Sequence, residues 1–440
     1  MKTTKTMTRV LSVGLTAALG ASVLSACAQQ AGSDEDTTER TLRIATLSGY
    51  GSDDEWFRQQ YTELFEFANP NITIEIVPAV DYSKINWNAG EQAPNPQEEL
   101  KKMMQGPNPP DLVALDLSYL PDLINENLLK PLDPLITADK FDTSKIVPTV
   151  IEGIKEAAPD GKLYALAPLF SSTALFYNKK LFMEAGVPFP TDGMTWDQIF
   201  DLARQVARGE GNDRKYGFAF TNYQYSDPFW EMSVYTQPLQ LSYYDPSGDK
   251  MAVDTDSWEK VWRTIADLQQ EGIIPGQPNY EEMPMREYNG PYDWDNFLSG
   301  RLAMVIGYYY FVNELINANR TAETDENYDG VDWDVVTMPV HPEYPGIGGS
   351  ISLQAMMGIN ANAQNPDDAW KFLKFLNGDD WARLKSRSQS MLVSNVDYLQ
   401  PKEGLDYNIS AFYQLKPAPA VMEDSSMWLR YPNLYMVQSI

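Results

Sequence analysis

Residues 161–187, GKLYALAPLFSSTALFYNKKLFMEAGV, carry the pattern that decides the fold of this chain. Leu163–Pro168 and Ala174–Lys179 are apolar runs typical of buried strands, and Leu181–Ala185 is a short helix that Gly186 ends. Strands followed at once by a helix are a unit of α/β folds. This segment therefore predicts an α/β protein.

The same alternation extends to both sides of this segment. Thr41–Leu47 alternates apolar and polar residues as a strand does, and Asp54–Ala68 places its aromatic residues at helical spacing. Further elements are expected at Ile72–Val77, Glu98–Met104, Pro110–Leu115, Leu120–Asn127, Trp196–Arg208, Tyr216–Phe220, Ser257–Glu271, Arg301–Gly307, Trp333–Val340 and Asp367–Leu376. Strands that alternate with helices from the start favour a largely parallel sheet.

The N-terminus has the order of an export signal. Lys2, Lys5 and Arg9 precede an uncharged apolar stretch, and Leu24-Ser25-Ala26-Cys27 ends it with the only cysteine of the chain. These four residues resemble the bacterial lipobox, so residues 1–26 are expected to be a cleaved lipoprotein signal peptide and Cys27 to carry the lipid. The alternative is an ordinary secretory peptide with an incidental cysteine. Residues 27–40 are expected to form a disordered tether, because the residues after Cys27 are small, polar and acidic.

Composition restricts the function. Without the three signal-region cations, 31 Lys and Arg face 61 Asp and Glu, a formal charge of −30, which disfavours nucleic acid as a partner. The single histidine, His341, nearly excludes His-rich zinc sites and histidine relays, and it is expected to be a solvent-exposed spacer in a proline-rich loop. We expect no cofactor and no metal.

Two other patterns are interpreted as structural. Asp325–Gly330 matches the first half of a calcium loop, but Val336 occupies the twelfth position, where a bidentate Glu is required, so a turn is expected. The many carboxylates guarantee chance pairs, and none stands in a recognisable glycosidase motif. The protein is therefore predicted not to be an enzyme.

The order of several segments carries a family resemblance. The lipobox is followed by TLRIATLSGYG (41–51), NPPDLVALDLSYLPDLINENLLKPLD (108–133), the segment 161–187, MTWDQIFDLARQVA (194–207), FLSGRLAMVIGYYYF (297–311) and DAWKFLKFL (368–376). This order is similar to that of the extracellular solute-binding proteins of bacterial ABC sugar importers, which are relatives of maltose-binding protein. The resemblance covers nearly all of the mature chain, and 164–167 with 175–179 is its most specific part.

The resemblance implies a type II periplasmic-binding-protein-like fold with two interleaved α/β lobes. Three hinge crossovers are expected, near Pro168–Ser171, Gly307–Tyr309 and Ser350–Ser352. The N-lobe is then 41–168 plus 308–350, and the C-lobe is 169–307 plus 351–440. About 414 mature residues are also too many for one core, and no linker separates the lobes. Relatives usually continue with one more amphipathic helix, so the sequence is either a fragment or a chain whose C-lobe lacks its last helix.

The resemblance also implies partners and a location. A monomer, anchored to the outer face of the bacterial cytoplasmic membrane through acylated Cys27, would hold a solute between its lobes. The membrane permease subunits would recognise the closed shape. An oligosaccharide is favoured, because several aromatic side chains can serve several sugar rings. The alternatives are a lipid-anchored carbohydrate-active enzyme, and a peptide-specific or metal-specific binding protein on the same scaffold.

Candidate ligand-binding residues follow strands or lie at the expected crossovers, where aromatic faces, carboxylates and backbone amides can meet a sugar. They are Ser48, Tyr50, Asp81, Tyr82, Asp116, Tyr119, Phe170, Ser171, Trp230, Tyr309, Tyr310, Gly348, Gly349, Ser350 and Trp428. The alternative is a helix cap for Asp116, core packing for Trp230 and Tyr310, and a loop or packing role for several of the others. Relatives often have Gly-Pro-Trp where this chain has Tyr308–Tyr310.

Overall fold

The computed structural model describes residues 38–51, 54–222, 232–245, 250–276, 290–348, 351–387 and 391–418. The strands are β1 (Arg40–Gly49), β2 (Ile72–Asp81), β3 (Leu112–Ala114), β4 (Ala165–Leu166), β5 (Leu169–Asn178), β6 (Met304–Tyr308), β7 (Trp333–Val336), β8 (Ile351–Gln354), β9 (Met357–Ile359) and β10 (Leu392–Val393). The helices are α2 (Glu55–Phe57), α3 (Glu63–Ala68), α4 (Pro96–Met104), α5 (Leu120–Asn125), α6 (Asp133–Asp139), α7 (Pro148–Ala157), α8 (Lys179–Ala185), α9 (Trp196–Val206), α11 (Ser233–Thr236), α12 (Asp256–Gln270), α13 (Phe311–Ala322), α14 (Pro366–Leu376) and α15 (Asp379–Lys385). A π-helical turn, Arg58–Thr62, joins α2 to α3.

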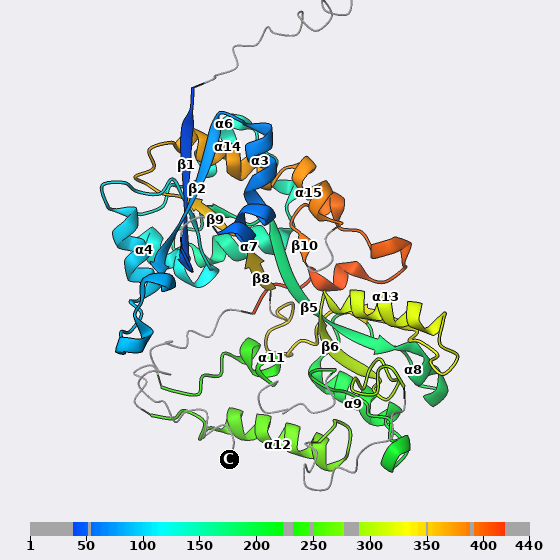
Figure 1. The fold of residues 1–440 in the computed structure, drawn as a ribbon. Helices are drawn as coiled ribbons and strands as arrows, with labels where there is room; N and C mark the ends of the chain where they lie inside the picture. The colour runs from blue at the N-terminus through cyan, green and yellow to red at the C-terminus, as the bar shows by residue number, and fades with distance from the viewer. Residues whose placement is uncertain are drawn as a thin grey trace, which may run out of the picture.

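The strands form two sheets, and each is the centre of one lobe (Figure 1). The first sheet has the order β2-β1-β3-β9-β4. Strands β1, β2 and β3 are parallel, so their carboxyl ends share one edge, and Gly49 pairs there with Asp81. We call the part built on this sheet the first lobe.

The second sheet is organised around β5. Strands β6, β7, β8 and β10 all run antiparallel to β5. The expectation of a largely parallel sheet therefore holds for β2-β1-β3 and is wrong for the second sheet. We call the part built on this sheet, with α8, α9, α11 and α12, the second lobe.

The chain crosses between the two sheets at several places. One crossing lies where it was expected, and another lies a few residues after its expected position. It passes from β4 to β5 at Ala167-Pro168, as expected, and from β8 to β9 at Ala355-Met356, after the expected Ser350–Ser352. It passes a third time between α15 and β10. The crossover expected at Gly307–Tyr309 is not found among the described strands, because β6 and β7 both pair with β5.

These crossings correct the expected lobe assignment after residue 307. Strand β7, within 308–350, belongs to the second sheet, whereas β9, within 351–440, belongs to the first. Helix α14 follows β9 into the first lobe, where Phe372 lies edge-on to Phe65 of α3 with ring centroids 5.0 Å apart. The lobes are interleaved in sequence, as expected, but the segments after residue 307 are assigned to the lobes differently from the expectation.

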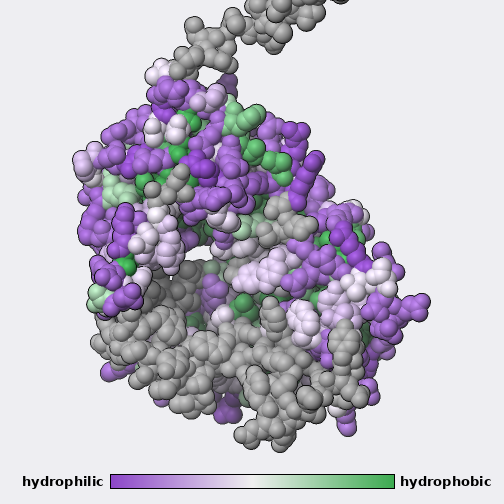
Figure 2. Space-filling model, in the orientation of Figure 1, coloured by the Kyte–Doolittle hydropathy of each residue, from purple (hydrophilic) through white to green (hydrophobic). Residues whose placement is uncertain are grey.

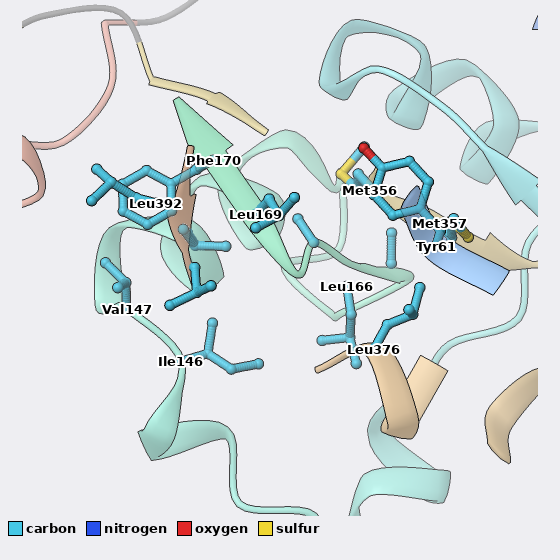
Figure 3. Close-up of a cluster of buried hydrophobic side chains, with 14 of the residues drawn as sticks. Tyr61, Ile146, Val147, Leu166, Leu169, Phe170, Met356, Met357, Leu376 and Leu392 are labelled. Carbon is cyan, nitrogen blue, oxygen red and sulfur yellow. The ribbon is translucent and has the colours of Figure 1, made fainter. Parts of the chain in front are cut away.

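Each lobe is stabilised by buried apolar side chains. One cluster extends from β1, β2 and α14 across the crossovers, and Figure 3 shows the part of it around Phe170, which pairs with Leu392 of β10. A second cluster joins α9 and α12 through Trp196, Phe200 and Trp258. Apolar burial is worth about 25 cal/mol per Å², so these clusters supply most of the driving force for folding.

Two helices of the second lobe begin with side-chain caps. Thr195 begins α9 with a capping box to Gln198, and Thr255 accepts a hydrogen bond from the Trp258 amide at the start of α12. In contrast, the strand expected at Tyr216–Phe220 is reduced to isolated bridges at Tyr216 and Ala219. No helix within the described residues is long and apolar enough to cross a membrane.

The prediction for His341 is wrong. The residue is only 5% exposed, and its Nε2 lies 2.7 Å from the carbonyl oxygen of Tyr235. The segment after β7 packs against α9, where Val340 bridges to Thr195, and this packing buries the imidazole beside Tyr235. Burial lowers the pKa of His341.

Candidate functional site

The candidate site lies at the carboxyl edge of the first sheet. Tyr50 follows the end of β1 directly, Tyr82 follows the end of β2, and Asp116 follows β3 by two residues. Because the three strands are parallel, their following loops meet at one edge, which is where α/β proteins bind ligands. In Figure 2 the surface is hollowed below the first lobe, on the side of α11 in Figure 1.

The carboxylate of Asp81 ties two of these loops together. Its Oδ1 accepts hydrogen bonds from the Gly51 amide at 2.8 Å, the Ser83 amide at 3.0 Å and the Ser83 hydroxyl at 2.5 Å. Its Oδ2 lies 2.9 Å from the ammonium group of Lys84. The Ser83 hydroxyl, followed by Lys84, holds the pKa of Asp81 well below its usual range. Asp81 therefore positions the loops that carry Tyr50 and Tyr82.

Three aromatic rings follow one another at this edge, and we call them the aromatic platform: Tyr50, Tyr82 and Trp87. The ring centroids of Tyr50 and Tyr82 are 5.6 Å apart, and those of Tyr82 and Trp87 are 6.3 Å apart. Tyr50 is 82% exposed and Trp87 is 56% exposed, while Tyr82 is half-buried. Sequence reasoning missed Trp87, although its place five residues after Tyr82 in an irregular segment was an available signal.

Asp116 and Tyr119 lie beside the platform. Both belong to the segment after β3, in which Leu117–Tyr119 forms a 3-10 turn. Burial raises the pKa of Tyr119, and the charge of Asp116 and the neighbouring Tyr82 contribute to the rise. The Asp116 side chain is exposed and, within the described residues, makes no capping hydrogen bond. The cap alternative for Asp116 is therefore not observed, and its carboxylate is available to sugar hydroxyls.

The three tyrosines at the end of β6, Tyr308–Tyr310, point in alternating directions. Tyr308 and Tyr310 are 45% and 43% exposed, and their rings are stacked with centroids 5.9 Å apart and an angle of 12°. Tyr309 is only 3% exposed and packs edge-on against Phe412, with the Lys402 ammonium 4.6 Å from its ring centroid. Tyr309 is therefore a packing residue in this conformation, whereas Tyr308, which was not among the candidates, offers an exposed ring.

The remaining described candidates have structural roles in this conformation. Phe170 has no exposed surface and lies in the core shown in Figure 3, which corrects the expectation of a ligand contact. Ser171 is partly exposed and pairs with Ser352, and Ser48 pairs with Val80 between β1 and β2. The Gly348 amide donates to the Lys416 carbonyl at 3.2 Å and is buried, so it is not presented to a ligand.

Five predicted functional residues lie outside the described residues: Cys27, Trp230, Gly349, Ser350 and Trp428. The contribution of Trp230, Trp428, Gly349 and Ser350 to the site remains a prediction.

The segment 325–330 behaves as a turn. Asp325 Oδ1 accepts a hydrogen bond from the Asn327 amide at 2.9 Å, as an Asx turn does. Over the part of the chain that the structure describes, no group of three or more His, Cys, Asp or Glu side chains could hold a metal ion.

A two-lobe α/β molecule with exposed aromatic rings and a carboxylate at the strand ends, next to a hollow, belongs to the class of hinged binding proteins. The chain is a member of the bacterial extracellular solute-binding protein family, whose model matches residues 48–383. This membership confirms the family resemblance found in the sequence, and the family description implies a location outside the cytoplasm.

Individual relatives are distant. A binding protein of Brucella abortus (strain 2308) is 22% identical over 385 residues, which are 84% of this chain and 81% of the relative. The maltotriose-binding protein of Pyrococcus abyssi is 24% identical over 298 residues, 65% of this chain and 54% of the relative. The crystal structure of a sugar transporter from Rhizobium etli in an open conformation superposes with a TM-score of 0.58 at 22% identity, and covers 91% of this chain and 92% of that one. This likeness confirms the type II fold.

Proposed function

We propose that this protein is the substrate-binding lipoprotein of an ABC importer, which captures an oligosaccharide between its lobes and delivers it to a membrane permease. The observation that carries the proposal is the aromatic platform beside the exposed carboxylate of Asp116. Sugar rings present C–H faces that stack on aromatic rings and hydroxyls that donate to carboxylates. A metal ion, which binds through oxygen, nitrogen or sulfur ligands, has no comparable use for several exposed rings in a row.

The relatives support a carbohydrate ligand. The Pyrococcus abyssi relative is a maltotriose-binding protein, and the Rhizobium etli structure is a sugar transporter. The first is named as a binding protein and the second as a transporter, and neither name describes an enzyme, which favours capture over catalysis. That this chain turns over no glycan remains a prediction.

The two-lobe architecture supplies the mechanism of capture. A ligand that contacts both lobes binds the closed state better than the open one, and this difference in affinity shifts the equilibrium towards closure. The first lobe offers the platform, and the exposed Tyr308 and Tyr310 lie at the end of β6 in the second sheet and just after it. A permease that recognises the closed shape would then receive only loaded protein.

The N-terminal segment supports anchoring. Two or three acyl chains on Cys27, at about 0.8 kcal/mol per buried methylene, would hold the protein stably at a bilayer without a spanning helix. The acidic residues of the expected tether and the formal charge of −30 would keep the folded part in solution above anionic headgroups.

A glycan screen tests the function. Thermal unfolding of the purified mature chain is measured with mono-, di-, tri- and tetrasaccharides and with short peptides. A ligand at about 100 times its Kd adds ~2.7 kcal/mol to the unfolding free energy, so a selective rise in Tm with oligosaccharides is expected. A rise with peptides alone would contradict the proposal, and new reducing ends in the incubation would favour the enzyme alternative.

Substitution of the lipid acceptor tests the anchor. Cys27→Ser removes the only thiol, so we expect the variant to move from the membrane fraction to the soluble fraction on cell fractionation. If the variant stays in the membrane fraction like the wild type, lipidation at Cys27 is not the anchor.

A further inference from the structure

We infer that the ammonium group of Lys402 positions the exposed ring pair Tyr308 and Tyr310, so that ligand capture weakens in alkaline solution. This inference rests on the proposed sugar-binding function and adds a regulation of the same site to it. Nothing in the sequence pattern singled out Lys402, because its contacts are with residues of another segment of the chain.

The first link runs through the ring of Tyr309. The Tyr309 amide donates to the Ser172 carbonyl of β5 at 3.0 Å, which fixes the backbone between the two exposed rings. The Lys402 ammonium lies 4.6 Å from the Tyr309 ring centroid, a distance at which a cation is attracted to an aromatic face. Because Tyr309 is the residue between Tyr308 and Tyr310, its inward position also holds the two outward rings, which stack with centroids 5.9 Å apart.

The second link is a hydrogen-bonded connection to Tyr310. The Lys402 Nζ donates to Asn313 Oδ1 at 3.1 Å, and Asn313 Nδ2 donates to the Tyr310 carbonyl at 3.1 Å. The Asn313 amide donates to the same carbonyl at 2.9 Å, so one asparagine holds the backbone of Tyr310 at the start of α13. A hydrogen bond from a charged donor is roughly twice as strong as one between neutral groups. The charge of Lys402 therefore acts on Tyr310 as well as on Tyr309.

This charge is kept although it lowers the stability of the fold. Lys402 is partly buried, and burial lowers its pKa to about 8, while the charge of Glu403 acts in the opposite direction. A lysine in an unfolded chain has a pKa of about 10.4, so the unfolded chain binds this proton more tightly than the folded protein does. The unfolding free energy should therefore rise as the pH increases from about 8 to about 10. Such a group is typical of a functional site.

The other groups that face Lys402 in the described part of the chain do not change charge near the pKa of the lysine. Burial raises the pKa of Tyr309 and of Tyr407, so both rings stay neutral. Glu403 is paired with Arg320 of α13 at 2.7 Å, and carboxylates and guanidinium groups stay charged in neutral and mildly alkaline solution. Titration of this cluster is therefore titration of Lys402.

Ligand affinity measured against pH tests the inference. The probe is maltotriose or the oligosaccharide that gives the largest rise in Tm in the glycan screen. Isothermal titration gives its Kd at about pH 7 and about pH 9.5, on either side of the pKa of Lys402. The proteins are the mature wild type, Lys402→Arg, which keeps the charge at both pH values, and Lys402→Met, which has none. Far-ultraviolet circular dichroism confirms that each variant is folded.

Lys385→Met is the matched control. The Lys385 ammonium lies 5.7 Å from the Trp381 ring centroid, and burial also lowers the pKa of Lys385. Its Nζ, however, donates to Gln60 of the first lobe at 3.3 Å. This control therefore removes a similar cation from an aromatic face without touching the tyrosines after β6.

We expect the wild type to bind about three- to tenfold more weakly at the higher pH, because the attraction between the cation and the ring is lost. Lys402→Arg should bind equally well at both pH values, Lys402→Met should bind weakly at both, and Lys385→Met should behave like the wild type. Urea unfolding of the free proteins gives the contrast that a merely structural role would not produce. Relative to Lys402→Met, the wild type should gain stability over the same pH range in which it loses affinity.

A measurement without ligand follows the rings directly. Hydroxyl-radical footprinting read by mass spectrometry should show Tyr308 and Tyr310 oxidised and Tyr309 protected in the wild type at about pH 7. Oxidation of Tyr309 should increase at about pH 9.5, and in Lys402→Met at both pH values, because the ammonium no longer holds its ring.

Three results would overturn the inference. Equal losses of affinity with pH in the wild type and in Lys402→Arg would assign the effect to another group. A Lys402→Met variant that binds like the wild type at the lower pH would separate Lys402 from ligand capture, and unchanged protection of Tyr309 in this variant would exclude the positioning role. A wild type that binds no glycan contradicts the proposed function itself, whereas the footprint still tests the position of the rings.

Discussion

The carboxylate of Asp81 joins two loops whose hydrogen-bonded residues are 30 positions apart, and this single side chain orders the site. The residue type and its place after a strand suggested a direct contact with a ligand. In the structure its Oδ1 accepts hydrogen bonds from Gly51 and Ser83, and its Oδ2 forms an ion pair with the Lys84 ammonium group. We therefore propose that Asp81 acts on ligand binding through the loops that it holds together.

Removal of the Asp81 carboxylate should weaken glycan binding without removing a ligand contact. We expect Asp81→Ala to raise the Kd of the best oligosaccharide about tenfold, since the loss of one or two charge-assisted hydrogen bonds lets the loops move. Asp142→Ala is the matched control, because Asp142-Thr143-Ser144-Lys145 repeats the same capping motif in the loop before α7. Titration calorimetry measures both, and equal affinities for the two variants would contradict the positioning role.

Asp295 should make the stability of the second lobe depend on pH. It is buried, it accepts hydrogen bonds from the Phe297 and Leu298 amides, and burial raises its pKa to about 6. Between pH about 4 and 6 the unfolded chain loses this proton while the folded chain keeps it, so the unfolding free energy falls as the pH rises, by up to about 3 kcal/mol.

The Asp295→Asn variant isolates this effect, because the amide oxygen can accept the same backbone hydrogen bonds and cannot ionise. Urea unfolding followed by tryptophan fluorescence should show the variant gaining stability relative to the wild type from pH 4 to 6. Parallel pH profiles for the two proteins would show that Asp295 does not titrate in this range.

At the scale of elements, the packing of strand β9 shows how a segment that follows the second sheet in sequence fits into the first sheet. It is short, it sits between β3 and β4, and Gly358 at its centre lies against the backbone of Tyr164. A Cβ at Gly358 would be 2.8 Å from the Tyr164 carbonyl oxygen and 3.1 Å from a methyl carbon of Leu129. The strand fits the centre of the first sheet only because it carries no side chain there.

Alanine at Gly358 should therefore destabilise the first lobe by about 1–3 kcal/mol through overpacking. Gly153→Ala in α7 is the comparison, because a Cβ there meets only Pro417 at an ordinary 3.6 Å, and alanine favours the helix by up to about 1 kcal/mol. Thermal unfolding should move the two melting temperatures in opposite directions. A Gly358→Ala variant as stable as the wild type would mean that β9 can shift away from β4.

For the whole molecule, the division into two lobes around β5 permits closure. Strand β5 begins at the crossover from the first sheet and runs through the second, so rotation at the crossovers changes the angle between the lobes while each core stays packed. The Rhizobium etli structure with which the chain superposes is in an open conformation. Ligand contacts across the hollow would favour the closed state.

Small-angle X-ray scattering measures this change. Saturating oligosaccharide should lower the radius of gyration of the mature chain, because the two lobes approach each other. A monosaccharide that reaches only one lobe should leave the profile nearer to that of the free protein. If an oligosaccharide binds in calorimetry and the profile does not change, capture does not involve closure.

The sequence by itself determined what depends on neighbouring residues: the alternation of strands and helices, and the gathering of Tyr50, Tyr82 and Asp116 after parallel strands. Such features follow from local periodicity and from the rule that parallel strands share an edge. Only the tertiary structure decided that Phe170 and His341 are buried, that Tyr309 turns inward between Tyr308 and Tyr310, and that β7 and β9 lie in other sheets than expected. These outcomes depend on contacts between segments far apart in the chain, whose energies local pattern does not contain.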